Sequence, residues 1–158
     1  MAYQSVGEIF AAMDETRARF NARIGALGAE EAGARADAEA WTVAEIVEHV
    51  SLVEKQIVKL MTLMLMKAET GGARAREDGR IAPVELDQII ERSLREKYQS
   101  PETSRPAGNI SLGDSLALMS ATRTALHELR PRLEAADLTT VSYPHPVFGQ
   151  FNLYEWLV

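Results

Sequence analysis

The sequence has 158 residues, of which 46% are hydrophobic, and this size and composition predict one globular domain spanning residues 1–158. It contains no cysteine, which excludes disulfides, thiol catalysis and thiolate metal sites and is compatible with a reducing cytoplasm. The net charge of −6, from 23 acidic and 17 basic residues, disfavours nucleic acid as a partner because phosphate binding requires clustered Lys and Arg.

The first predicted helix begins with a capping box, in which Ser5 is the N-cap and Glu8 reaches back to it. Apolar residues then recur at helical spacing as far as Leu27, and Gly28 is a candidate stop. Residues 29–40 are rich in Ala, Glu and Gly, which indicates a short surface helix or a loose connection.

The second predicted helix also begins with a capping box, formed by Thr42 and Glu45. Trp41 precedes the N-cap and is placed to pack as a hydrophobic staple against the first turn. A broad apolar stripe continues to about Ala68, and the pair Gly71-Gly72 ends the helix. The methionines in the stripe are expected to fill an irregular core: Met61, Met64 and Met66.

No segment of the sequence indicates a membrane protein. The longest uncharged apolar run, residues 60–66, is far shorter than the ~20 residues that a membrane span requires. The first ten residues lack the basic and apolar regions of a signal peptide. We therefore expect a soluble, cytoplasmic protein with no membrane partner.

Three features are predicted between the second and third long helices. The cluster of Arg74, Arg76 and Arg80 is interrupted by acidic residues, and a solvated loop is preferred there over a binding patch. Pro83 precedes or opens a short extra helix that carries Leu86, Ile89, Ile90 and Leu94. Residues 100–106 form a polar connection punctuated by prolines.

The third long helix begins near Ser111 and Asp114, which form a variant of the capping box. Pro131 is expected to end or kink this helix near Arg130, with a short continuation before Asp137. Its apolar face consists of Leu112, Leu116, Met119, Leu126, Leu129 and Leu133.

A fourth helix begins at the end of the sequence. Residues 141–150 contain two prolines and a glycine and exclude a regular helix, after which Asn152 is a candidate N-cap. Leu153 and Trp156 begin an apolar stripe that stops at Val158 after less than two turns. Three long helices need a fourth to close their core, so the sequence predicts an all-α four-helix bundle. We hypothesise that the natural protein continues beyond Val158.

The three histidines are the residues with the clearest functional potential. His49 lies on the inward side of the second helix, where a hydrogen-bonded structural role and a metal-ligand role both remain open. His127 is expected to be exposed, and His145, between two prolines, is expected to hold a rigid turn. Glu45 is explained by its cap, and Glu48 is expected to face solvent. Sequence motifs of zinc proteases, phosphate loops, serine hydrolases and EF-hands are absent, so no catalytic residue is predicted.

Two separated stretches resemble the DinB-like (DinB/YfiT) superfamily. The stretch WTVAEIVEHV, residues 41–50, is similar to that family's W-[ST]-x-x-E-x-x-x-H motif. The stretch HPVFG, residues 145–149, followed by NLYEWL, residues 152–157, is similar to the sequence that leads into the family's last helix. The order and lengths of the predicted helices also fit, so the resemblance covers nearly the whole chain.

The resemblance implies a four-helix bundle, commonly dimeric, that holds a divalent metal ion with three histidines. The position of His49 matches the first ligand, while the other two would lie four residues apart, shortly after the E-W-L motif and beyond Val158. The metal could be Zn, Ni, Fe or Mn. Family members of known activity act on small molecules as metal-dependent thiol S-transferases that use low-molecular-weight thiols, as hydrolases or as isomerases. The competing hypothesis is a non-catalytic, dimerising or stress-related bundle without a functional metal site.

Overall fold

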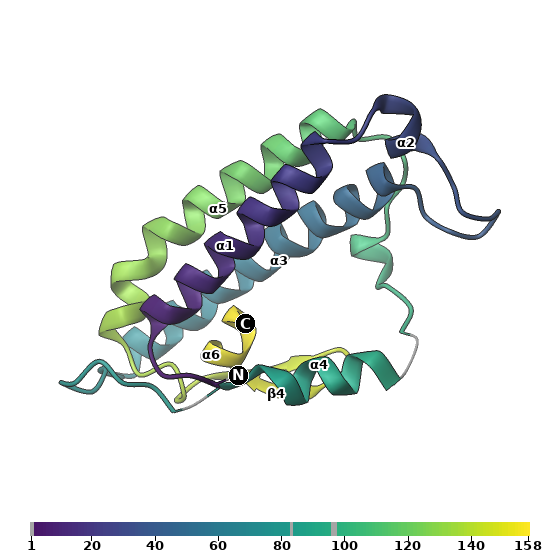
Figure 1. Cartoon of the computed structure of the whole chain (residues 1–158). Helices are drawn as coiled ribbons and strands as arrows, with labels where there is room; N and C mark the ends of the chain where they lie inside the picture. Colours follow the sequence, from purple (N-terminus) through teal and green to yellow (C-terminus); the bar gives the residue numbers. More distant parts are fainter. Residues whose placement is uncertain (1, 83, 96–97) are drawn as a thin grey trace. The chain divides into compact units, whose positions relative to one another are not determined.

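The computed structural model describes residues 2–82, 84–95 and 98–158. Helices dominate these ranges, and Figure 1 traces them in chain order. The long ones are α1 (Val6–Gly25), α3 (Val43–Thr70) and α5 (Leu112–Ala135). The short elements are β1 (Ala2–Tyr3), α2 (Ala29–Gly33), β2 (Val84–Glu85), α4 (Leu86–Arg95), the 3-10 helix η1 (Glu102–Ser104), β3 (Ser142–His145), β4 (Gly149–Asn152) and α6 (Leu153–Leu157).

The chain divides into two compact units, each of which contains parts of the long helices. The first unit comprises residues 1–14, 59–99 and 127–158, and the second comprises residues 15–58 and 100–126. In the second unit the buried core consists of Ile24, Val47 and Met119, with Phe20, Leu27, Val43, Val50, Leu112 and Leu116 packed against it. Fully buried apolar side chains of the first unit include Ile9, Phe10, Met61, Leu65, Leu133, Leu138 and Leu153. The predicted apolar stripes therefore supply most of these buried side chains, whereas Leu138, in the connection after α5, lies in none of them.

Glycines lie at the ends of α1 and α3 and at the beginning of α2. At the end of α3 the amide of Gly72 donates to the carbonyl of Glu69, and the amide of Ala73 donates to the carbonyl of Ala68, both at 3.0 Å. Gly72 has φ +76, so this is the Schellman motif that a left-handed glycine permits. Helix α1 ends at Gly25, and Gly28, which was expected to stop it, is instead the N-cap residue of α2.

A β-hairpin leads into α6. Strands β3 and β4 pair antiparallel from Ser142 with Asn152 to His145 with Gly149, and Gly149 has φ +86 at the turn. Asn152 then caps α6 through a reciprocal pair of hydrogen bonds with Glu155, of 2.7 and 3.0 Å. Figure 1 shows β4 continuing directly into α6. The interruption of helix over residues 141–150 was predicted; this strand pairing, and that of β1 with β2, was not.

One expectation about the long helices is met in part, and another is wrong. Helix α5 does not end at Arg130; it runs through Pro131 to Ala135, which is the short continuation expected before Asp137. Proline forfeits one backbone hydrogen bond, but Leu133, two residues later, is fully buried and packs this end of the helix. Met66 is not a core residue, because 53% of its surface is exposed, whereas Met61 and Met64 are buried as predicted.

The short extra helix between the second and third long helices is present as α4. Pro83, which was expected to open this helix, lies outside the described residues. Within the described ranges, no helix combines the length and the hydropathy needed to cross a membrane.

Candidate functional site

The beginning of α3 is held by a reciprocal cap. The amide of Thr42 donates to Glu45 Oε2 at 2.7 Å, and the amide of Glu45 donates to Thr42 Oγ1 at 3.1 Å. Arg35 also donates to Glu45, at 2.6 Å. The Thr42 amide, and next the Arg35 guanidinium, hold the pKa of Glu45 below its usual value. The predicted capping box is thus confirmed, and it fixes the turn from which the next side chains project.

His49, one turn after the cap, is half-buried and makes a hydrogen bond to a distant segment. Its Nδ1 lies 2.6 Å from the carbonyl oxygen of Ser104, with the Ser100 hydroxyl 3.4 Å away. A carbonyl only accepts hydrogen bonds, so Nδ1 carries the proton. In the neutral imidazole the lone pair therefore resides on Nε2, the nitrogen that a metal ion would bind.

Trp41, the residue before the N-cap, packs against the ring of His49. The two ring centroids are 5.1 Å apart with an interplanar angle of 53°. Ile46, the staple partner that the capping motif would predict, is 43% exposed. Trp41 thus packs on one side of the His49 ring. The hydrogen bond to Ser104 fixes the rotation of that ring about the Cβ–Cγ bond.

Glu48 does not face solvent as the sequence suggested; only 2% of its surface is exposed. Its Oε1 accepts a hydrogen bond from the amide of Ala107 at 3.0 Å, and its Oε2 accepts one from the amide of Gly108 at 3.1 Å. A buried carboxylate needs such partners, because an unpaired one costs several kcal/mol. Since both oxygens are occupied, Glu48 orders the chain around residues 107–108.

The segment that contacts His49 is itself ordered by short-range and long-range hydrogen bonds. Gln56, two turns after His49 on α3, donates to the carbonyl of Thr103 at 2.8 Å. The Ser104 hydroxyl donates to the carbonyl of Pro101 at 3.2 Å, and Ser104 is 2% exposed. Residues 100–106, whose sequence predicts only a polar connection, therefore supply the partner of His49.

A metal site requires more ligands than His49. Among residues 2–82, 84–95 and 98–158, no three His, Cys, Asp or Glu side chains are grouped closely enough to hold a metal ion. Glu48, next in sequence, has both oxygens engaged by amides. His49 therefore fits the role of one ligand, with a defined tautomer and a free Nε2, but the described residues do not complete the site.

The other two histidines have structural partners within the first unit. His127 Nε2 lies 3.0 Å from Asp14 Oδ1, and its ring packs edge-on against Phe10 with centroids 5.2 Å apart. With 38% of its side chain accessible, His127 is partly exposed, whereas the sequence predicted an exposed residue.

His145 holds the hairpin turn, as predicted for a residue between two prolines. Its Nδ1 accepts from the amides of Val147 and Phe148 at 3.1 and 3.3 Å. The ring packs on Phe148, Phe151 and Trp156, with centroids 4.6 to 5.0 Å apart. Because Nδ1 accepts, the neutral ring carries its proton on Nε2, and burial lowers the pKa of His145. Neither nitrogen offers the free lone pair that His49 offers.

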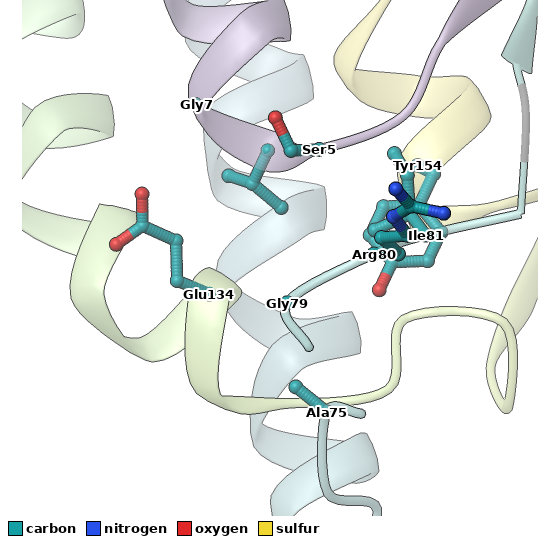
Figure 2. A pocket seen from close by; sticks show the side chains of 9 residues that line it. Ser5, Gly7, Ala75, Gly79, Arg80, Ile81, Glu134 and Tyr154 are labelled. Carbon is teal, nitrogen blue, oxygen red and sulfur yellow. The ribbon is translucent and has the colours of Figure 1, made fainter. Parts of the chain in front are cut away.

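The first unit also contains a pocket of about 360 Å³, shown in Figure 2. Glu134 lies on one side of it, and Arg80, Ile81 and Tyr154 lie on the other (Figure 2). Two of the polar groups there are already engaged: Glu134 accepts from Arg130 at 2.8 Å, and the Ser5 hydroxyl accepts from the amide of Glu8 at 3.2 Å. The pocket therefore presents weaker evidence for a specific ligand than the His49 region.

Comparisons with known proteins agree with this architecture. The crystal structure of TT2238, described as a four-helix bundle protein, is similar with a TM-score of 0.62 and 21% sequence identity, over 96% of this chain and 86% of that one. The fold is therefore the predicted all-α four-helix bundle, with α4 as the short extra helix. The family model of the DinB superfamily matches residues 12–158, and the chain belongs to that superfamily. No curated protein matches the chain.

Proposed function

We propose that this protein binds a divalent metal ion with His49 as one ligand and uses it in small-molecule chemistry. The observation that carries this proposal is the hydrogen bond from His49 Nδ1 to the Ser104 carbonyl. Metal-bound histidines commonly donate their second ring nitrogen to a carbonyl or carboxylate, which fixes the tautomer and raises ligand basicity. Membership of the DinB superfamily is consistent with it.

The proposed reaction class is a thiol S-transferase or a hydrolase. A bound divalent ion with an open position would lower the pKa of a water or a low-molecular-weight thiol. In this proposal the residues of this chain hold the metal ion and orient the histidine that binds it. His49 supplies the ligand nitrogen, Trp41 packs on its ring, and Ser104 keeps the proton on Nδ1.

The described residues contain no group of three candidate ligands, so the proposal needs ligands besides His49. The alternative function is a non-catalytic, dimerising bundle in which His49 serves only to hold the segment around Ser104. The two functions make opposite predictions about bound metal, so metal content separates them directly. A homodimer is proposed under both, and light scattering of the purified protein tests it.

The decisive experiment is elemental analysis of protein expressed from its natural gene and purified without chelators. We expect a stoichiometric amount of divalent metal in the wild type and its loss in His49→Ala. His127→Ala is the matched control, since that histidine already donates to Asp14, and it should retain the metal. Equal metal content in wild type and His49→Ala would remove His49 from the site and favour the non-catalytic bundle.

A further inference from the structure

We propose that Glu48 is a positioning residue for His49: by anchoring the chain at residues 107–108 it holds the Ser104 carbonyl on Nδ1 and so keeps Nε2 unprotonated. The functional meaning of this role rests on the proposed metal site. The structural claim itself, that one buried carboxylate sets the tautomer of its neighbour, does not. It concerns only residues of the second unit.

The anchor is a buried carboxylate that receives two consecutive amides. Both oxygens of Glu48 are occupied, at 3.0 and 3.1 Å, and the side chain is 2% exposed. Gly108 has φ +69, the left-handed conformation that turns two successive N–H groups toward one anion. Charge-assisted hydrogen bonds of this kind are roughly twice as strong as neutral ones. Residues 107–108 are therefore held firmly against α3.

The anchored point is connected to Ser104 by a stiff linker. Only Arg105 and Pro106 separate Ser104 from Ala107. The proline ring fixes φ of Pro106, and the residue before a proline is confined to extended conformations. Arg105 is extended as expected, with φ −70 and ψ 131. Because this linker has little freedom, fixing Ala107 also fixes where the carbonyl of Ser104 lies.

The other anchor of this segment is weaker. Gln56 donates to Thr103 from an exposed position, where water competes for the same groups. The hydrogen bond that Ser104 makes with Pro101 is internal to the segment and does not tie it to α3. The two buried hydrogen bonds to Glu48 are thus better suited than those of Gln56 and Ser104 to set the distance between the Ser104 carbonyl and His49.

Glu48→Gln is the sharpest test because it preserves the size of the side chain. The amide retains one acceptor oxygen, but its NH₂ group would face a backbone N–H, which is a repulsive contact. We expect increased hydrogen exchange at Ala107 and Gly108. We also expect ¹⁵N NMR of the neutral His49 ring, at about pH 8, to show a wild type protonated on Nδ1 and a variant in which the Nε2–H tautomer appears.

Glu54→Gln is the matched control, since it removes the same charge from the same helix at a residue that pairs with Arg17 of α1 instead. It should leave the His49 tautomer unchanged. Gly108→Ala is the second variant, for the case that Glu48→Gln does not fold. An added Cβ meets only Glu45 Oε1 at 3.9 Å, so its effect comes from the left-handed backbone, and it should shift the tautomer in the same direction.

The proposal is overturned if Glu48→Gln loosens residues 107–108 while His49 remains protonated on Nδ1, or if Glu54→Gln moves the tautomer equally. Metal affinity gives a separate readout: loss of a group that supports a ligand typically weakens binding 10–100-fold, and we expect about 10-fold for Glu48→Gln. If His49→Ala retains its metal but Glu48→Gln still shifts the tautomer, the proposed function fails and the positioning role stands.

Discussion

His49 Nδ1 and the carbonyl oxygen of Ser104 are 2.6 Å apart although 55 positions separate the two residues in the chain. This hydrogen bond joins a histidine with a fixed tautomer to a segment that has little regular structure. It serves both functions considered for the protein. As a metal ligand, His49 needs its proton fixed on Nδ1 so that Nε2 can bind the ion. As a purely structural residue, it satisfies the buried carbonyl of Ser104.

The first prediction concerns stability and holds under either function. In His49→Ala the buried Ser104 carbonyl loses its donor, and an unsatisfied buried polar group costs about 1–3 kcal/mol. Urea unfolding should show this loss, and hydrogen exchange should increase over residues 100–108. His127→Ala, which leaves a partly exposed partner in contact with water, should cost less. Equal losses in the two variants would contradict a special role for the Ser104 contact.

The second prediction tests the cap of α3. Thr42→Ala removes the hydroxyl that accepts a hydrogen bond from the Glu45 amide. Loss of such an N-cap costs about 1 kcal/mol of unfolding free energy. Thr124→Ala is the control, because that hydroxyl lies in mid-helix and bonds to the carbonyl of Ser120. Alanine is a better helix former there, so the control should be neutral or slightly stabilising. Chemical denaturation compares the two, and a neutral Thr42→Ala would show that the cap is dispensable.

Local patterns predicted the fold well because the responsible interactions are local. Each capping box joins residues three apart, as between Asn152 and Glu155, and each apolar stripe follows from helical spacing. The errors arise where distant packing decides the outcome. Helix α5 passes through Pro131, where an end and a kink were both left open, and Met66 is exposed although it lies in a run of apolar residues. The hairpin was not predicted, because Pro144 and Pro146 argue against a regular element there. Its strands pair through a turn in which Gly149 has a positive φ.

The candidate site was less predictable than the fold. His49 was identified from its place in a motif, and its neighbour Glu48 was assigned to solvent. The partners of Glu48 are two backbone amides about 60 positions away, and every residue except proline carries such an amide. No side-chain pattern marks the amides of Ala107 and Gly108 as its partners. Ser104 escapes notice for the same reason, because it contributes a carbonyl group rather than its side chain.

The third prediction is that Pro131→Ala stabilises the protein. The substitution restores the missing hydrogen bond within α5 and removes the clash of the proline ring with the preceding turn. Pro131 is exposed, so little packing is lost. Proline also stabilises a protein by ~0.4–1 kcal/mol because it reduces the conformational entropy of the unfolded chain, and the substitution loses this contribution. We therefore expect a net gain in unfolding free energy on the order of 1 kcal/mol. Thermal or urea unfolding measures it. Pro101→Ala, outside the long helices, should give no gain, and a destabilised Pro131→Ala would show that α5 needs the proline.

The fourth prediction follows from the hairpin histidine. Burial lowers the pKa of His145 from its ordinary 6.5, so the unfolded chain binds this proton more tightly than the folded one. The contribution of His145 to stability is therefore complete above pH 6.5 and is lost as pH falls through the lower, folded pKa. Protonation would also remove the lone pair that accepts the amides of Val147 and Phe148.

We expect the hairpin to loosen as pH falls from about 7.5 to about 5.5, a range that spans the ordinary pKa of a histidine. Trp156, whose ring lies 5.0 Å from that of His145, reports the change through its fluorescence. In His145→Gln the group that titrates is gone, so the difference in urea midpoint between the two pH values should shrink. His127→Gln is the matched control, because that ring lies outside the hairpin and should leave the Trp156 signal unchanged. An equal pH dependence of Trp156 in wild type and His145→Gln would assign the effect to another group.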